Sequence, residues 1–267
     1  MENLFGETIM KINEGDSIIL YDLKKGRRKS IFVENKTMKI KGFGVFNPID
    51  FVGKNYGEII ELSGKRVMLE PPSIIESIRG LKRKAQIILP KDSGIMILYA
   101  NLKPGDIVVE GGTGSGALTI VLANFVRPSG RVISYEVNED FAKVAEYNLR
   151  IMDLDKYVEI KLKDIKKGID EKDVDSVFLD IPEPWDVVSN AYESLKPFGY
   201  FVAYVPTIEQ ARKTYLALKD GGFYNVEVFE ILQRNIVIKP LGTRPDHNML
   251  GHTGYIITGR KLPKKLL

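Results

Sequence analysis

The sequence lacks cysteine altogether, and among its 267 residues only His247 and His252 remain as soft metal ligands. Without cysteine there can be no disulfide bond and no thiolate zinc site. Nowhere do some eighteen apolar residues follow one another, and the opening stretch, MENLFGETIM, has acids where a signal peptide would have lysines. We therefore expect a cytoplasmic protein with no metal and no membrane segment.

A strong excess of one charge sign is also missing, because 39 Lys and Arg stand against 35 Asp and Glu, for a net charge of +4. This balance permits a polyanionic partner without requiring one. The basic residues concentrate in three runs, DLKKGRRKS at 22–30, RGLKRK at 79–84 and GRKLPKKLL at 259–267. Such runs are usually solvated surfaces, and they become candidate phosphate contacts if the substrate is RNA.

Short runs of alternating apolar residues occupy positions 16–70, each bounded by Gly, Asn or charged clusters. They predict a small antiparallel β domain over residues 1–72, with Pro71 and Pro72 as its linker. From Ser73 onward, strand-length apolar runs alternate with helix-length amphipathic ones. Residues 73–267 are therefore predicted to form a Rossmann-like α/β domain, with a mostly parallel sheet covered on both faces. Two late β-like runs, RNIVIKP and HTGYIITGRK, predict that this sheet finishes antiparallel at one edge.

The stretch VVEGGTGSGAL at 108–118 predicts a glycine loop between a strand and a helix. Glycines allow a sharp turn and let a nucleoside lie against backbone atoms. The spacing fits both G-x-G-x-x-G/A of dinucleotide-binding enzymes and E-x-G-x-G of nucleoside-binding methyltransferases. The loop alone leaves both cofactor classes open.

Acids are predicted at the ends of the following strands. Glu136 ends the next strand, where a carboxylate accepts the ribose hydroxyls of a nucleoside in either class, and Asp164 could accept a bond from an adenine amino group. The stretch VFLDIPEPW at 177–185 brings Asp180 to the same sheet edge, and its prolines then fix an extended turn. An acid before a rigid turn suits a planar, amine-bearing substrate, on whose base Trp185 could stack. Methyl transfer is thereby favoured over hydride transfer.

Taken together, these segments resemble the tRNA adenine-N1 methyltransferases of the archaeal and bacterial TrmI family. The likeness covers nearly the whole chain and includes EGGTGSGALT, SYEVNEDFA, FLDIPEPW and RPDHNMLGHTGY. The D-x-P-x-P-W turn combined with G-H-T-G is much more specific than the glycine loop. The resemblance implies a class I fold that binds S-adenosylmethionine, a homotetramer, and methylation of T-loop adenosine 58 in tRNA, with adenosine 57 as a second acceptor in some archaeal members.

The resemblance also implies roles for particular residues. Asp180 would be the catalytic carboxylate, and the cofactor site would comprise Gln86, Ile88, Glu110, Gly112, Gly114, Ser115, Gly116, Glu136 and Asp164. Substrate contacts are expected from Pro182, Trp185, His252 and Thr253, and from the basic residues Lys24, Lys25, Arg27 and Arg28. One position departs from the family, because Leu89 stands where a tyrosine able to contact the target base is usual.

Other functions remain open from the residues alone. A class I methyltransferase acting on a small molecule or a corrinoid would use the loop and Glu136 but would leave the basic β domain without a use. A non-catalytic RNA-binding subunit would be expected to have lost the loop glycines or Asp180, and this chain has both. A nicotinamide oxidoreductase would have no evident use for the proline turn.

Overall fold

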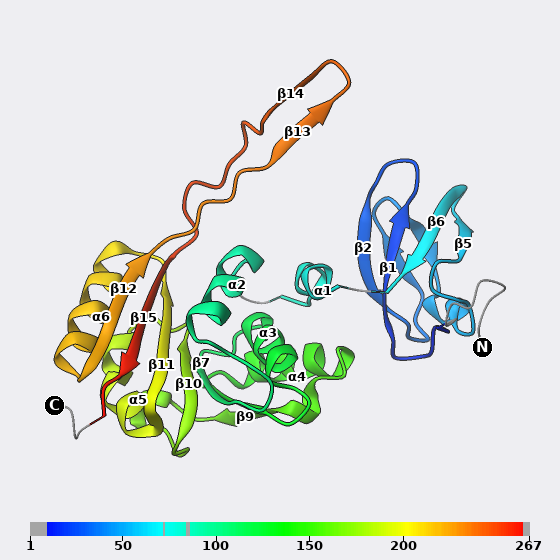
Figure 1. Ribbon diagram of the computed structural model, residues 1–267. Coiled ribbons are helices and arrows are strands. Elements are labelled where there is room, and N and C mark those ends of the chain that lie inside the picture. The colour runs from blue at the N-terminus through cyan, green and yellow to red at the C-terminus, as the bar shows by residue number, and fades with distance from the viewer. Residues whose placement is uncertain (1–9, 72, 84–85, 264–267) are drawn as a thin grey trace. The chain divides into compact units, whose positions relative to one another are not determined.

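The computed structural model describes residues 10–71, 73–83 and 86–263, and Figure 1 shows their path. Two compact units emerge. The first comprises the described residues up to Lys82 together with Tyr147–Asp153, and the second comprises the rest. Pro72 of the predicted linker, Lys84 of the second basic run and residues 264–267 of the third lie outside the described residues. The predicted boundary between residues 72 and 73 stays a prediction.

The first unit is built from antiparallel strands. Its main sheet has the strand order β2 (Arg28–Phe32), β1 (Ser17–Asp22), β6 (Lys65–Glu70) and β5 (Ile59–Leu62). The remaining elements are a hairpin of β3 (Met38–Ile40) and β4 (Gly44–Phe46), η1 (Pro48–Phe51) and α1 (Ile74–Gly80). Its core includes Ile18, Leu20, Val67 and Leu69, which are completely buried. The predicted amino-terminal antiparallel β region is confirmed.

The second unit contains a mixed sheet with the order β12 (Phe223–Phe229), β15 (Tyr255–Lys261), β11 (Leu195–Val205), β10 (Val174–Leu179), β7 (Ile107–Gly111), β8 (Arg131–Glu136) and β9 (Val158–Leu162). Strands from β11 to β9 are parallel, whereas β15 is antiparallel to both β11 and β12. The predicted α/β sheet with an antiparallel edge is therefore confirmed.

Helices pack against this sheet. They are α2 (Pro90–Tyr99), α3 (Ala117–Val126), α4 (Glu139–Ile151), α5 (Val188–Ser194) and α6 (Ile208–Asp220), with short turns η2 (Asp155–Tyr157), η3 (Ile165–Lys167) and η4 (Pro184–Val187). In the described part of the chain, none of the helices combines the length and the apolar character that crossing a membrane requires.

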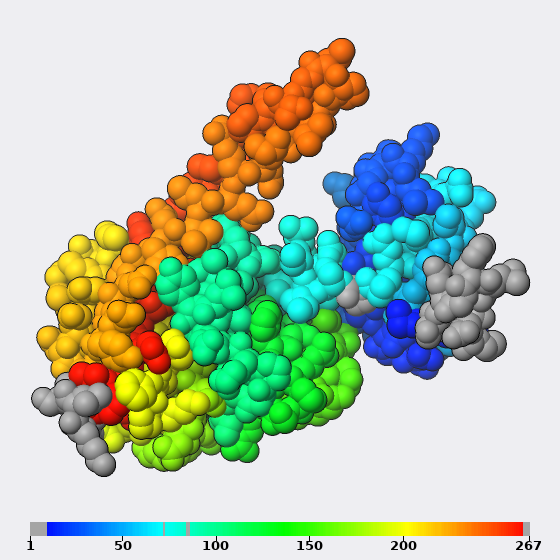
Figure 2. Space-filling view, in the orientation of Figure 1, coloured from blue at the N-terminus to red at the C-terminus, as the bar shows by residue number. Residues whose placement is uncertain are grey.

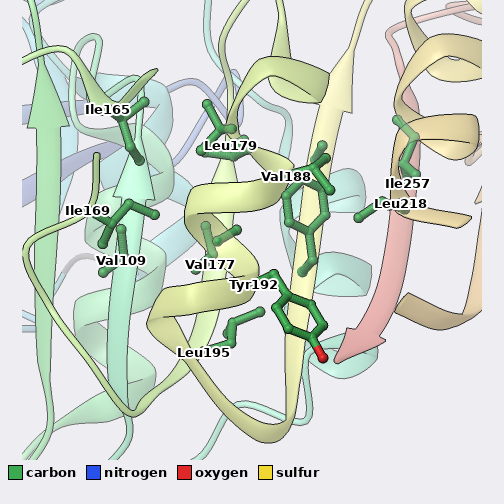
Figure 3. Packing of buried hydrophobic residues seen from close by; sticks show 14 of the residues in the cluster. Val109, Ile165, Ile169, Val177, Leu179, Val188, Tyr192, Leu195, Leu218 and Ile257 are labelled. Carbon is green, nitrogen blue, oxygen red and sulfur yellow. The ribbon is translucent and has the colours of Figure 1, made fainter. Parts of the chain in front are cut away.

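The core of the second unit explains the unbroken apolar runs of its central strands. Side chains of β7, β8 and β10 are buried on both faces of the sheet. Val109 and Val177 of the sheet belong to one cluster with Val188 and Tyr192 of α5 and Leu218 of α6 (Figure 3). The chain proceeds from β7 through β8 to β9 on one side and then through β10 to β11 on the other. Ligands of open α/β sheets bind where the strand order reverses in this way, here between β7 and β10.

One of the two late β runs does not join this sheet. β13 (Ile236–Lys239) pairs with β14 (Gly242–Pro245) in a two-stranded ribbon, which Figure 2 shows standing clear of the body of the second unit. The prediction that both runs finish the sheet is therefore wrong for β13. Ile236 and Ile238 are 56% and 79% exposed, so β13 has no buried apolar face that would hold it in register in the seven-stranded sheet. We call residues 232–251, which carry this ribbon, the arm.

Candidate active site

The glycine loop joins the end of β7 to the start of α3. Gly112 has a φ of +92°, and its amide donates to the carbonyl of Tyr135 at 2.9 Å. A Cβ atom at Gly112 would lie 2.2 Å from the carbonyl oxygen of Asp180, a distance that no side chain can tolerate. Gly116, with a φ of +81°, is the left-handed residue that precedes α3. The bare backbone at Gly112 thus lets the ends of β7 and β10 meet.

Glu136 holds the loop from the end of β8. Its Oε2 accepts the amide of Gly114 at 2.9 Å, and its Oε1 accepts the amides of Val137 and Asn138, also at 2.9 Å. These bonds fix the carboxylate and use three of its roughly four lone-pair sites, so that Oε2 can still accept one hydroxyl group. The geometry therefore suits the ribose-binding role predicted for Glu136.

Glu110 lies beneath the loop. Its side chain is completely buried, and its Oε2 accepts the hydroxyls of Thr119 and Ser134, both at 2.6 Å. Burial raises the pKa of Glu110 to about 8, although the two hydroxyl bonds act in the opposite direction. Burial therefore favours the neutral form of Glu110 more than it would for an exposed glutamate. A cavity of about 690 Å³ lies above the loop, and Glu110, Ser115 and Gly116 are not among the described residues that line it.

This cavity opens at the carboxyl ends of the strands. The predicted site residues that line it are Gln86, Gly112, Gly114, Glu136, Asp164, Asp180 and Pro182. Sequence reasoning missed the other lining residues, Tyr135, Val137, Phe141, Lys163, Ile165, Lys166, Ile181, Tyr204, Pro206 and Gln210. Applying the strand-end rule to β11 would have found Tyr204 and Pro206, because that strand ends at the same edge of the sheet.

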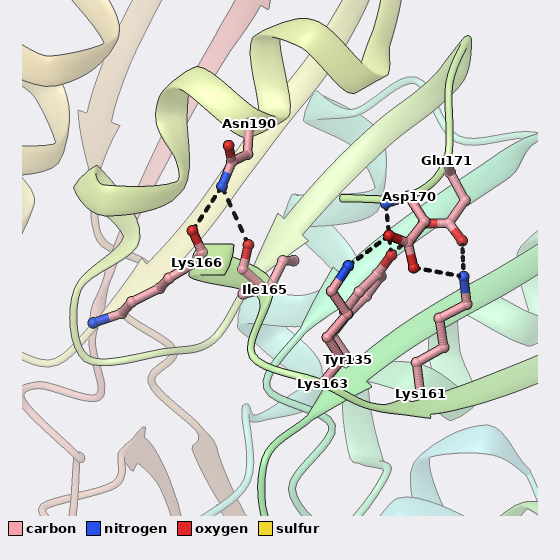
Figure 4. A network of polar contacts seen from close by, with 8 residues as sticks. All are labelled: Tyr135, Lys161, Lys163, Ile165, Lys166, Asp170, Glu171 and Asn190. Carbon is pink, nitrogen blue, oxygen red and sulfur yellow. Dashed lines mark hydrogen bonds and ion pairs between the residues drawn. The ribbon is translucent and has the colours of Figure 1, made fainter. Parts of the chain in front are cut away.

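The wall that contains Asp164 is held by a polar network (Figure 4). Asp164 caps η3 by accepting the amide of Lys166 at 3.0 Å. Asn190 of α5 donates to the carbonyl of Lys166 at 2.9 Å, and the Tyr135 hydroxyl donates to Glu171 at 2.6 Å. Asn190 therefore anchors the segment that presents Asp164 to the cavity, and Tyr135 anchors Glu171, which follows that segment in the chain.

Asp180 lines this cavity and also a smaller one of about 200 Å³. The smaller cavity is otherwise formed by Gln86, Ile87, Ile88, Leu89, Tyr204, Pro206 and Thr253. Burial raises the pKa of Asp180 to about 7, and no donor among the described residues makes a hydrogen bond with its carboxylate. An acid with unused acceptor capacity thus faces both cavities, which is the arrangement expected of a group that binds a reacting molecule.

The structure separates the predicted substrate contacts. Thr253 lines the smaller cavity. His252 Nε2 donates to the carbonyl of Pro206, which lines the same cavity, at 2.8 Å, and His252 Nδ1 lies 3.0 Å from Glu230 Oε2. Trp185 lies in η4 with the Lys213 ammonium 5.0 Å above its ring, and it is absent from the described linings of both cavities.

The predicted basic contacts belong to the first unit. Lys24 and Lys25 line a hollow of about 530 Å³ together with Lys65 and Arg66, which the sequence prediction did not include. Arg28 is already engaged, because it pairs with Glu70 at 3.3 Å and lies 4.5 Å above the ring of Tyr21; Arg27 is not among the residues that line this hollow. Among the residues that the structure describes, no group of three His, Cys, Asp or Glu side chains could hold a metal ion.

Comparison with known proteins gives consistent matches. A family model described as the tRNA methyltransferase complex GCD14 subunit matches residues 77–243. The tRNA (adenine(57)-N(1)/adenine(58)-N(1))-methyltransferase TrmI of Methanocaldococcus jannaschii is 40% identical over 242 aligned positions, and the match covers 80% of this chain and 86% of that protein.

Two solved structures extend the likeness to the fold. The tRNA (m1A58) methyltransferase TrmI from Aquifex aeolicus superposes with a TM-score of 0.80 at 30% identity, covering 96% of this chain and 100% of its own. A SAM-dependent O-methyltransferase from Thermotoga maritima gives a TM-score of 0.87 at 37% identity, covering 95% of this chain and 96% of its own. The predicted class I methyltransferase fold is confirmed.

The close approach at Gly112 generates a prediction. Gly112→Ala should weaken binding of S-adenosylmethionine by about 10²-fold, because a left-handed alanine is strained and its Cβ would displace Asp180. Isothermal titration calorimetry measures the loss. Gly15→Ala is the matched control, since Gly15 of the first unit has a φ of +89° with nothing within 4 Å of an added Cβ. Equal affinities for Gly112→Ala and the native protein would contradict the assignment.

Proposed function

The chain belongs to the GCD14 family of tRNA methyltransferases, and on this premise we propose that it methylates N1 of adenosine 58 in the T-loop of tRNA. Adenosine 57 is included as a second acceptor, because the name of the Methanocaldococcus relative includes both positions. The methyl donor is S-adenosylmethionine, and a tRNA substrate implies that the protein works in the cytoplasm. The observation that most strongly supports this proposal is that one carboxylate, Asp180, faces both cavities.

The larger cavity fits the cofactor, which supplies an electrophilic methyl group. Gly112 and Gly114 present bare backbone to the cavity, Glu136 offers a remaining acceptor site for a ribose hydroxyl, and Asp164 offers an acceptor for an adenine amino group. Holding two reactants in line in a site that excludes water can supply about 7–11 kcal/mol of the rate enhancement. Positioning therefore carries most of the catalysis.

Asp180 addresses the electronic problem of the acceptor. Adenine N1 is a weak nucleophile, because its lone pair is delocalised with the 6-amino group, and the methylated base is cationic. A carboxylate that accepts a hydrogen bond from the 6-amino group pushes electron density toward N1 and stabilises the developing positive charge. Asp180 has the unused acceptor capacity for this bond, and it must be ionised to stabilise the charge.

The acceptor base has to leave its stack to enter the smaller cavity, which costs a few kcal/mol that contacts elsewhere must offset. Leu89 lines this cavity, so its wall is aliphatic at the position where the family usually has tyrosine. Tyr204 supplies an aromatic side chain to both cavities. We place the base between these two side chains, beside Asp180.

Asp180→Asn should lower kcat on an unmodified tRNA transcript by about 10²–10³-fold, because the amide keeps the shape but loses the charge. The wild-type rate should fall as the pH drops through about 7, since the raised pKa of Asp180 means that the carboxylate is protonated below it. The residual rate of Asp180→Asn should lack this acidic limb. Product nucleosides are quantified by mass spectrometry.

Transcripts with adenosine 57 or 58 changed to guanosine serve as the substrate controls. Loss of N1-methyladenosine with the position-58 change locates the main acceptor, and a further loss with the position-57 change identifies the second. Tight cofactor binding without any tRNA product would refute the proposal and favour a small-molecule or corrinoid acceptor. A protein that binds tRNA but not the cofactor would be a non-catalytic subunit.

Lys24 and Lys25 are proposed to contact the tRNA backbone, together with Lys65 and Arg66 of the same hollow. Lys24→Gln with Lys25→Gln should reduce the slope of log affinity against log salt concentration by about 2, since each lost phosphate contact removes nearly one unit. Fluorescence anisotropy of labelled tRNA at several salt concentrations gives the slope. Lys36→Gln, an exposed lysine of the same unit outside the hollow, should leave it unchanged. A slope unaffected in the double variant would place the RNA elsewhere.

The homotetramer is proposed with the arm as part of the contact between copies. An isolated two-stranded ribbon is marginally stable in water, and this one exposes Ile238 by 79% and Leu241 completely. Ile236 and Ile238 share one face of the ribbon, and Val237 and Lys239 share the other, because side chains alternate along a strand. A second copy that covers the isoleucine face would account for its exposure.

Ile238→Asp should therefore shift the molar mass measured by light scattering from a tetramer to a smaller species. The matched variant Lys239→Ser, on the opposite face of the same strand, should retain the tetramer. A native protein that is already monomeric, or an Ile238→Asp protein of unchanged mass, would contradict the role assigned to the arm.

A further inference from the structure

Both ends of the arm meet at one lysine. The Lys91 ammonium, at the start of α2, donates to the carbonyl of Ile231 just before the arm and to the Thr253 hydroxyl just after it, each at 2.7 Å. Its third donor reaches Asp92 Oδ1, also at 2.7 Å. Thr253 in turn donates to Asp92 Oδ2 at 3.0 Å. Lys91, Asp92 and Thr253 therefore form a closed ring, which we call the Lys91 ring.

The Lys91 ring is buried and saturated. The Asp92 side chain is 0% exposed and that of Lys91 is 9% exposed. Buried charges are tolerated only when their partners satisfy them, and here the three donors of the ammonium have three acceptors. Because removing any acceptor leaves a buried donor without a partner, the ring has one favourable geometry. The ring therefore fixes the start of α2, at Lys91 and Asp92, relative to Ile231 and Thr253 at the two ends of the arm.

The Lys91 ring also abuts the smaller cavity. Thr253 lines that cavity beside Asp180, and so does Leu89, two residues before Lys91. His252 makes a second link nearby, since its two ring nitrogens bond Glu230 and the carbonyl of Pro206, another cavity residue. The end of the arm and the wall of the smaller cavity are thus joined through neighbouring residues.

We propose that the Lys91 ring is a positioning device for the methyl acceptor: it holds the wall of the smaller cavity in register with both ends of the arm, so that the acceptor base is presented correctly to Asp180. Lys91 and Asp92 act through the wall and not on the reacting atoms, whereas Thr253 is the member of the ring that belongs to the wall itself. The assignment of the acceptor as an adenine rests on the proposed function, whereas the mechanical link between the arm and the cavity does not.

Thr253→Val tests the proposal with little change in shape. Valine removes the hydroxyl that accepts from Lys91 and donates to Asp92, but it leaves the Lys91–Asp92 ion pair in place, whereas Lys91→Met would leave the buried Asp92 charge uncompensated. We expect kcat on tRNA to fall by about 10-fold or more, since small displacements of a reactant have large effects on rate. The KM for tRNA and the Kd for S-adenosylmethionine should stay within about 2-fold of the native values, because the larger cavity is not altered.

Two control variants accompany it. Thr253→Ser keeps the hydroxyl and should restore kcat, and Thr258→Val makes the same chemical change at a buried threonine of β15 outside the ring and should leave kcat unchanged. A native kcat in Thr253→Val would overturn the proposal. A parallel loss of cofactor affinity and kcat would overturn it as well, by showing a general structural defect.

Amide hydrogen exchange supplies a readout that does not depend on activity. In Thr253→Val, exchange should accelerate together at residues 86–92, 230–233 and 250–254, while α3 keeps its native protection. Unchanged exchange at 86–92 would show that the ring does not join the arm to the cavity wall, whatever the substrate is. If the native protein makes no N1-methyladenosine but exchange responds as expected, the proposed function fails and the mechanical link survives.

Discussion

The contact between the backbones of Gly112 and Asp180 is the constraint on which the site depends. With only 2.2 Å between the place of an added Cβ and the Asp180 carbonyl, the strand ends of β7 and β10 can meet only if the loop residue is glycine. Because these strand ends meet, the glycine loop lines the larger cavity, and Asp180 lines both that cavity and the smaller one. The reversal of strand order between β7 and β10 determines where the site lies, and the missing side chain of Gly112 allows the two strand ends to approach each other closely.

Environment then divides the work among three acids of similar intrinsic acidity. Glu136 accepts three backbone amides, which hold its carboxylate in place for the proposed contact with the cofactor. Glu110 is buried under the loop with two hydroxyl donors, and burial raises its pKa to about 8. Asp180 is buried without a hydrogen bond from any described residue, so its pKa is raised to about 7 and its oxygens are available to the proposed acceptor. All three acids lie at the carboxyl ends of neighbouring strands, and the roles that we propose for them differ because their hydrogen-bond partners differ.

The sequence was sufficient for the sheet and for the acids at its edge, because strand-end positions depend on local apolar runs and glycine spacing. It could not assign Glu110 to the interior, since a motif position does not reveal which way a side chain faces. The Lys91 ring depends on residues more than 130 apart along the chain, which no local pattern joins. The separate ribbon at β13 was missed because its alternation looks like that of a sheet strand, although the exposure of Ile238 shows that no sheet covers it. The roles assigned to the individual site residues remain predictions.

A crystal structure with S-adenosylhomocysteine and a T-loop RNA fragment would test the central claim most directly. We expect the cofactor ribose on Glu136 in the larger cavity, and the 6-amino group of the flipped adenine about 2.7–3.2 Å from the Asp180 carboxylate in the smaller one. The N1 atom should face the sulfur across the boundary of the two cavities. A base bound elsewhere, or an Asp180 carboxylate turned toward a protein donor with the base in place, would contradict it.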